Sequence, residues 1–149
     1  MVSTGEKVRE FTLKDQHGKD AALSAFRGRK VLLSFHPLAW TSVCARQMQS
    51  LEANLDALTK KNTVALGVSV DSVPCKKAWA AELKIEHTRL LADFWPHGGL
   101  AAQLGIFREH DGFSERANII IDEQGTVLFA KIYPMAEVPD MEEILRVLG

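Results

Sequence analysis

The sequence lacks the features that mark several large classes of proteins. No run of apolar residues approaches the roughly 20 that a membrane-spanning helix needs, and the N-terminal residues hold no apolar stretch typical of a secretory signal. The formal net charge of −1 gives no reason to expect nucleic acid or a membrane surface as a partner. We therefore expect a cytoplasmic protein that binds neither.

Cysteine is scarce as well, since the chain of 149 residues has only two. A chain of this length can bury a full core without disulfide bonds, and it shows no repeat or linker, so we predict a single domain over residues 1–149. There is no Cys-x-x-Cys pair, no His-x-x-x-His pair and no glycine-rich phosphate loop, so we expect no metal and no cofactor. Two cysteines in a chain without a signal indicate thiol redox chemistry in a reducing compartment.

What the sequence does contain is a strand, a short loop and a helix in close succession. Lys30–Phe35 is an apolar run typical of a buried strand. Apolar residues then recur at helical spacing, namely Cys44, Met48, Leu51, Leu55 and Leu58. With Thr41 or Ser42 as the N-cap, this spacing predicts a helix that runs to about Lys61 and holds Cys44 in its first turn.

The predicted position of Cys44 favours a reactive thiol. Unpaired N–H groups and the positive end of the helix dipole stabilise a thiolate in a first turn. The hydroxyl of Thr41 is expected to point at this turn, while Pro37 ends the strand and shields one side of the sulfur from water. The alternative is a small buried core residue, which is the commonest role of a free cysteine.

The rest of the chain alternates strand and helix patterns. The predicted elements are, in order, a hairpin of 10–14 and 21–23, a one-turn connector at 23–28, a strand at 63–70, a helix from Asp71 or Ser72 to Leu83, a strand at 88–92, a small helix at 100–104, a hairpin of 116–121 and 126–132, and a closing helix from about Pro139. This order predicts an α/β protein with the thioredoxin fold, in which a central mixed sheet is flanked by helices and preceded by an N-terminal hairpin.

Three motifs carry a resemblance to a known family. The spacing Pro-x-x-x-Thr-x-x-Cys, here Pro37, Thr41 and Cys44, is the signature of the peroxiredoxins. The segments Gly67–Ser72 and Arg116–Asp122 follow in the family's order, and together the motifs cover nearly the whole chain. The sequence therefore resembles the peroxiredoxin family of the alkyl hydroperoxide reductase and thiol-specific antioxidant type.

The resemblance implies a thiol-dependent peroxidase that needs no cofactor. Cys44 is then the nucleophile that reduces hydrogen peroxide or an organic hydroperoxide and becomes a sulfenic acid, with Thr41, Arg116 and Pro37 as the other catalytic residues. A thiol reductant such as a thioredoxin- or glutaredoxin-like protein restores Cys44, and a homodimer is expected. The alternative function is a non-enzymatic thioredoxin-fold module for redox sensing or binding, because many functions share one fold.

Three further side chains have two interpretations each. The resemblance places Arg116 beside the reactive sulfur, whereas an arginine at a strand start commonly reaches solvent. Gln47 stands where the family often has a glutamate that fixes this arginine, but it is equally interpretable as a solvated first-turn residue. His36 stands where relatives usually have an aromatic residue, and we expect it to pack beside the site rather than to bind a metal.

Cys75 is the second candidate thiol. It lies in the first turn of the helix that follows the next strand, so both cysteines are expected near the same edge of the sheet. Lys76, Lys77 and the helix start favour a thiolate there, which suggests that Cys75 resolves the Cys44 sulfenic acid as a disulfide. The alternative is a one-cysteine enzyme reduced by an outside thiol, because two separate helix starts are far apart for a disulfide bond.

Overall fold

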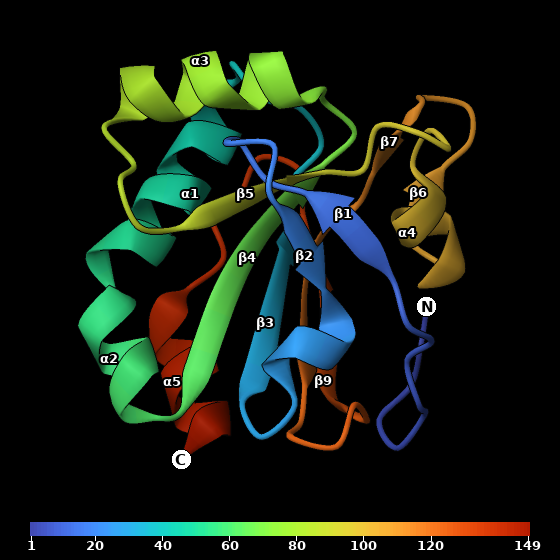
Figure 1. The fold of residues 1–149 in the computed structure, drawn as a ribbon, viewed down its shortest axis with the longest axis vertical. Helices are drawn as coiled ribbons and strands as arrows, with labels where there is room; N and C mark the ends of the chain where they lie inside the picture. Colours follow the sequence, from blue (N-terminus) through green and yellow to red (C-terminus); the bar gives the residue numbers. More distant parts are fainter.

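A computed structural model describes all of residues 1–149 as one seven-stranded sheet with helices around it (Figure 1). The strands are β1 (Thr12–Lys14), β2 (Asp20–Ala22), β3 (Lys30–Phe35), β4 (Thr63–Ser69), β5 (Arg89–Ala92), β8 (Arg116–Ile121) and β9 (Val127–Tyr133), and a separate two-stranded hairpin holds β6 (Phe107–Arg108) and β7 (Phe113–Ser114). The helices are α1 (Ser42–Ala53), α2 (Leu55–Lys60), α3 (Val73–Leu83), α4 (Gly99–Gln103) and α5 (Met141–Leu148), and a 3-10 turn covers Leu23–Phe26. No helix combines the length and apolar character that crossing a bilayer requires.

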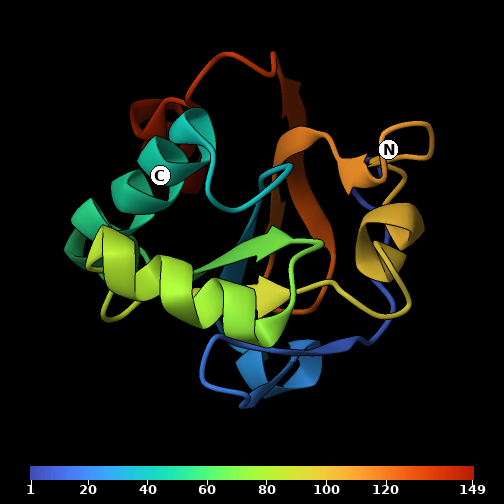
Figure 2. The same ribbon diagram turned by 90° about the horizontal axis from the view of Figure 1, so that it is seen from above.

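The sheet is mixed, as the sequence predicts, with the strand order β2-β1-β5-β4-β3-β8-β9. Strands β3, β4 and β5 are parallel neighbours, whereas β8 pairs antiparallel with β3 and with β9. The carboxyl ends of β3, β4 and β5 therefore lie at one edge of the sheet, and each is followed by a polar loop. Figure 2 looks down on this edge and shows the loop before α1 crossing the middle of it, with α3 to one side.

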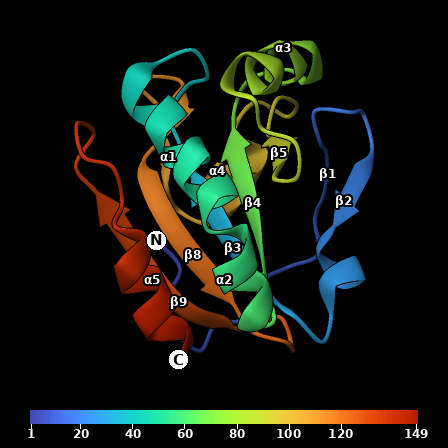
Figure 3. The ribbon, with the colours of Figure 1, turned by 90° about the vertical axis from the view of Figure 1, so that its left-hand side faces the viewer.

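Two apolar clusters fill the two faces of the sheet. On one face α1, α2, α3 and α5 pack against the strands, and α1, α2 and α5 lie in front of the sheet in Figure 3. On the other face the N-terminal segment and α4 cover the strands. Strand residues of β3 alternate between the faces, with Leu32 in the first cluster and Leu33 in the second, because successive side chains of a strand point to opposite sides.

Two features differ from the sequence-based prediction. The helix expected to reach about Lys61 is broken at Asn54, whose backbone angles (φ −104°, ψ 16°) lie outside the α-helical range. Its side-chain amide donates to the Ser50 carbonyl (2.8 Å), which also accepts from the backbone N–H of Asn54 (3.2 Å). The hairpin of β6 and β7 was not predicted, because its strands have only two residues each and give no alternating pattern. The remaining helices and strands agree within one or two residues.

One carboxylate fastens α1 to the segment that enters β5. The side chain of Glu52 accepts hydrogen bonds from the backbone N–H groups of Glu86 (2.8 Å), His87 (3.1 Å) and Thr88 (2.8 Å), and also from the hydroxyl of Thr88 (2.7 Å). Burial acts to raise the pKa of Glu52, but these hydrogen bonds outweigh it and lower the pKa to about 2. The ionised carboxylate is therefore part of the folded structure.

We expect Glu52→Gln to lower the free energy of unfolding at pH 7 by about 2 kcal/mol, the usual scale for hydrogen bonds to a charged group. Because the folded pKa lies below the ordinary value of 4.5, the stabilisation is complete above that value and is lost as the pH falls toward 2. Urea unfolding at pH 7 and pH 3 measures it, with the exposed Glu109→Gln as the control. If the free energies of unfolding of variant and parent differ by the same amount at both pH values, this role of Glu52 is contradicted.

Candidate active site

Cys44 is the third residue of α1, as the sequence predicts, and its side chain is fully buried. Thr41 is the N-cap, with extended backbone angles that let the chain turn from the loop into the helix. A hollow of about 350 Å³ opens over Cys44, and Pro37, Thr41 and Arg116 contribute to its lining. The buried sulfur can therefore be approached from this hollow.

The hydroxyl of Thr41 has a different partner from the one expected. The Thr41 side chain forms no hydrogen bond with the first turn of α1. Instead it donates to the carbonyl of Leu38 (2.7 Å), which fixes its rotamer. The oxygen keeps a free lone pair at the wall of the hollow, where it can accept a hydrogen bond from a small molecule.

Arg116 reaches Cys44 from the first residue of β8. Its Nη1 lies 3.3 Å from the Cys44 Sγ, and its Nε and Nη2 both donate to the carbonyl of Met135 (3.1 and 2.8 Å). The side chain is almost fully buried, so the alternative of a solvent-exposed arginine is wrong. A guanidinium held at this distance stabilises a negative charge on the sulfur.

Gln47 holds the arginine in place, one turn along α1 from Cys44. Its Oε1 accepts from Nη1 of Arg116 (2.7 Å), and its Nε2 donates to Ser34 Oγ (2.8 Å) and to the Phe35 carbonyl (3.1 Å). The Gln47 side chain is buried, and both its oxygen and its nitrogen form hydrogen bonds. The interpretation as a solvated glutamine is therefore also wrong.

The charge balance around Cys44 follows from these contacts. None of the ion pairs in the structure involves Arg116, whose oxygen partners are a neutral amide and a backbone carbonyl. A buried guanidinium is costly without an anion. The one contacting group that can supply a negative charge is the Cys44 sulfur, so the site is arranged to hold a thiolate.

Cys75 lies at the start of α3, where Ser72 caps the helix by accepting from the Cys75 N–H (3.4 Å). Its sulfur is 3.7 Å from a carboxylate oxygen of Asp71. Burial and the charge of Asp71 raise the pKa of the Cys75 thiol, against smaller opposing effects of the Trp40 indole and Lys76. The expectation that helix start and lysines make Cys75 a ready thiolate is therefore wrong. Both cysteines are free.

Sequence reasoning missed two parts of this site. Phe113 lines the hollow from β7, and an Asp-Gly pair at Asp111 and Gly112 was the available signal for that hairpin. The carbonyl of Met135, which orients Arg116, comes from the loop after β9 and leaves no trace in a side-chain pattern.

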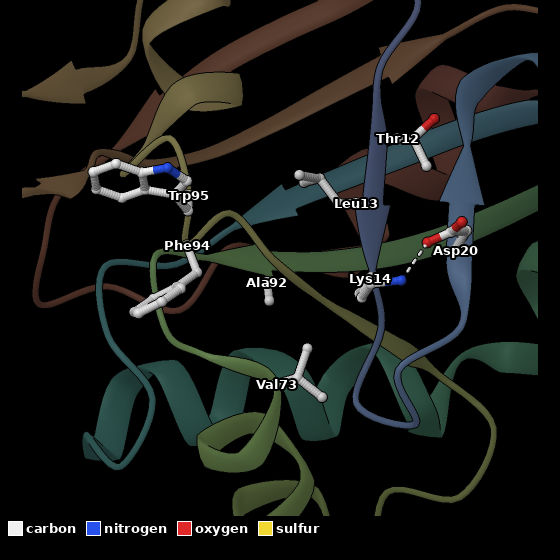
Figure 4. A pocket seen from close by; sticks show the side chains of 8 residues that line it. All are labelled: Thr12, Leu13, Lys14, Asp20, Val73, Ala92, Phe94 and Trp95. Atoms are coloured by element: carbon white, nitrogen blue, oxygen red, sulfur yellow. Dashed lines mark hydrogen bonds and ion pairs between the residues drawn. The ribbon is translucent and has the colours of Figure 1, made fainter.

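A second hollow, of about 300 Å³, lies between β1, the start of α3 and the loop after β5 (Figure 4). Phe94 and Trp95 stand at one side of it and the Lys14–Asp20 ion pair at the other. Its lining contains no cysteine and no residue of the Cys44 site, so it has no part in the chemistry described here. No group of three or more His, Cys, Asp or Glu side chains is placed to hold a metal ion anywhere in the chain.

The fold and the site together define a thioredoxin-fold thiol protein with a buried cysteine held by an arginine. Comparisons with known proteins give the family. The chain matches the sequence model of the AhpC/TSA family over residues 4–130. It is 36% identical over 141 residues to alkyl hydroperoxide reductase E of Mycobacterium tuberculosis, covering 94% of this chain and 92% of that protein.

Solved structures agree with this match. Enterococcus faecalis AhpC superposes with a TM-score of 0.91 at 25% identity, covering 99% of this chain and 91% of that one. The reduced 2-Cys peroxiredoxin of Plasmodium vivax superposes with a TM-score of 0.88 at 28% identity, covering 99% and 81%. The chain belongs to the AhpC/TSA family, the peroxiredoxins, and it is a thiol-dependent peroxidase rather than a non-enzymatic binding module.

Proposed function

We propose that Cys44 is the peroxide-reducing nucleophile of this enzyme and that Thr41, Arg116 and Pro37 assist it. The observation that carries the proposal is the 3.3 Å contact between Arg116 Nη1 and Cys44 Sγ in a buried site without a carboxylate partner for the arginine. Hydrogen peroxide and organic hydroperoxides are the proposed substrates, since the hollow over the sulfur offers both apolar walls and polar donors.

The reaction follows from the positions of these groups. The Cys44 thiolate attacks the terminal oxygen of the peroxide, so that an S–O bond forms as the O–O bond breaks. Thr41 accepts a hydrogen bond from the incoming peroxide, and Arg116 stabilises the charge that moves from sulfur to the leaving oxygen. The products are the Cys44 sulfenic acid and an alkoxide or hydroxide, which takes up a proton to become alcohol or water. Pro37 limits the access of water to the sulfur.

We further propose that an outside thiol restores Cys44. One thiol forms a mixed disulfide with the sulfenic acid and releases water, and a second thiol reduces that disulfide. A thioredoxin- or glutaredoxin-like protein in the cytoplasm supplies these thiols, since the two free cysteines suit a reducing compartment. A homodimer is the proposed assembly, supported by the exposed aromatic side chains of Trp40, Phe94 and Trp95.

The raised pKa of Cys75 favours the one-cysteine cycle over an internal disulfide. We therefore expect one equivalent of hydrogen peroxide to leave a Cys44 sulfenic acid beside a free Cys75 thiol. Peptide mass spectrometry without reductant, after trapping with dimedone, measures both residues in one digest. A Cys44–Cys75 cross-link as the main product contradicts the one-cysteine cycle, whereas dimedone on Cys75 contradicts the assignment of the nucleophile.

A further inference from the structure

Lys76 is a fully buried cation that the proposed reaction does not yet use. It lies near the start of α3, and its side chain is completely inaccessible to solvent. The Nζ atom lies 3.0 Å from Nε2 of His36 and 5.9 Å from the centre of the Trp79 ring, and Lys76 belongs to none of the ion pairs in the structure. Its one close polar partner is therefore a neutral ring nitrogen.

His36 is the residue between β3 and Pro37, so this contact joins α3 to the loop that leads to Cys44. Burial and the charge of Lys76 lower the pKa of His36 well below its usual value, and the imidazole is therefore neutral. Nε2 then accepts from the Lys76 ammonium, and the ring proton lies on Nδ1, which is buried without a partner.

Two carboxylates act on Lys76 from the loops after β4 and β5 without pairing with it. The carboxylate of Asp71, after β4, accepts hydrogen bonds from the Ala39 N–H and the Ser69 hydroxyl. The carboxylate of Asp93, after β5, accepts from two N–H groups at the start of α4 (2.9 Å each). Both carboxylates are thus committed to hydrogen-bond partners other than Lys76.

The two cysteines complete these surroundings. Burial lowers the pKa of Lys76, and the charges of Asp71, Cys75, Cys44 and Asp93 oppose this effect, so that the resulting pKa is about 7. Trp79, whose ring lies under the Lys76 ammonium, belongs to the same buried cluster as Cys44. The ammonium and the Cys44 sulfur thus border one water-excluded region, in which a charge–charge interaction is weakly screened. Arg116 is the other buried cation of this region, and its charge also lowers the pKa of His36.

The ammonium has no evident structural use. A buried charge without an opposite charge costs stability, and replacing buried ionic groups by apolar residues of similar volume is often neutral or stabilising. A methionine fills nearly the same space against Trp79 and keeps the apolar contacts of the lysine stem. The charge itself is what distinguishes Lys76 from such a residue, and the Cys44 site is the place where that charge has an effect.

We propose that Lys76 is a positioning residue of the peroxidase, whose buried ammonium, oriented by His36, stabilises the Cys44 thiolate from the α3 side while Arg116 contacts the sulfur from β8. The proposal rests on Cys44 being the nucleophile. Two cations from two elements then share one thiolate.

The test compares the rate of Cys44 alkylation by iodoacetamide at a series of pH values in Lys76→Met and the parent, both carrying Cys75→Ser so that a single thiol reacts. We expect alkylation at pH 6 to be about tenfold slower in Lys76→Met, with the whole pH profile displaced to higher pH, because a nearby charge has been removed. The melting temperature is expected to stay equal or to rise. A purely structural role for Lys76 predicts that Lys76→Met has a lower melting temperature and an unchanged pH profile of alkylation.

Two further variants sharpen the result. Lys77→Met removes an exposed lysine from the next position of α3 and is expected to leave the profile unchanged. Lys76→Gln keeps a hydrogen-bond donor for His36 but has no charge, so we expect it to shift the pH profile as Lys76→Met does. Lys76→Gln replaces Lys76→Met in the test if Lys76→Met does not fold. A folded variant with the parent's alkylation profile overturns the proposal. Alkylation consumes no peroxide, so this outcome is independent of whether Cys44 reduces peroxides.

Discussion

Replacing Cys44 with serine is expected to abolish peroxide turnover while leaving the fold intact. Serine has nearly the same volume as the buried cysteine and can occupy the same place in the first turn of α1. Its hydroxyl is not ionised near neutral pH, and it cannot be oxidised to an analogue of the sulfenic acid. Consumption of hydrogen peroxide by the reduced protein, with dithiothreitol as the thiol, measures the effect.

Cys75→Ser is the matched control for this experiment. It removes the other thiol of the chain, and in a one-cysteine cycle it is expected to turn over peroxide at the parent's rate with an outside thiol. Turnover that persists in Cys44→Ser contradicts the assignment of the nucleophile. Circular dichroism of both variants confirms that a loss of activity is not a loss of structure.

Arg116→Met is expected to lower the second-order rate constant for peroxide reduction by about 10²- to 10³-fold, the usual scale for removing one donor that stabilises transition-state charge. Methionine keeps the stem volume but loses the 3.3 Å contact with the Cys44 sulfur. It also frees Gln47 Oε1 and the Met135 carbonyl, which adds a small loss of stability. Stopped-flow mixing of the reduced protein with hydrogen peroxide measures the constant.

Arg116→Lys separates charge from geometry in the same experiment. A lysine keeps the positive charge but cannot donate to Gln47, to the Met135 carbonyl and to the sulfur in the fixed directions of a guanidinium, so we expect an intermediate rate. A rate constant for Arg116→Met within threefold of the parent's contradicts the assisting role of Arg116.

Much of this site was predictable from local patterns in the sequence. A strand, a proline and a helix start place Cys44 in the first turn of α1, and the two parallel strands β3 and β4 bring their loops to the same edge of the sheet. The mixed sheet follows from the order of strands and helices along the chain. These features depend on residues close together in sequence.

The features that were not predictable depend on tertiary contacts. The break at Asn54 is a local exception, since it lies in the backbone angles of one residue within an apolar pattern that is otherwise helical. The burial of Gln47 follows from the approach of Arg116, which is far away in the sequence. Lys76 has the sequence context of an exposed helical lysine, and only the packing of α3 over the end of β3 buries it.

The most direct test of the central claim is the rate at which Cys44 itself reacts with peroxide. The account predicts that reduced protein with the Cys75→Ser substitution reacts with hydrogen peroxide at least about a hundredfold faster than free cysteine at pH 7, because Arg116 contacts the sulfur and stabilises developing charge. Stopped-flow measurement under pseudo-first-order conditions gives both rates. A Cys44 rate equal to that of free cysteine contradicts the claim that the fold activates this thiol.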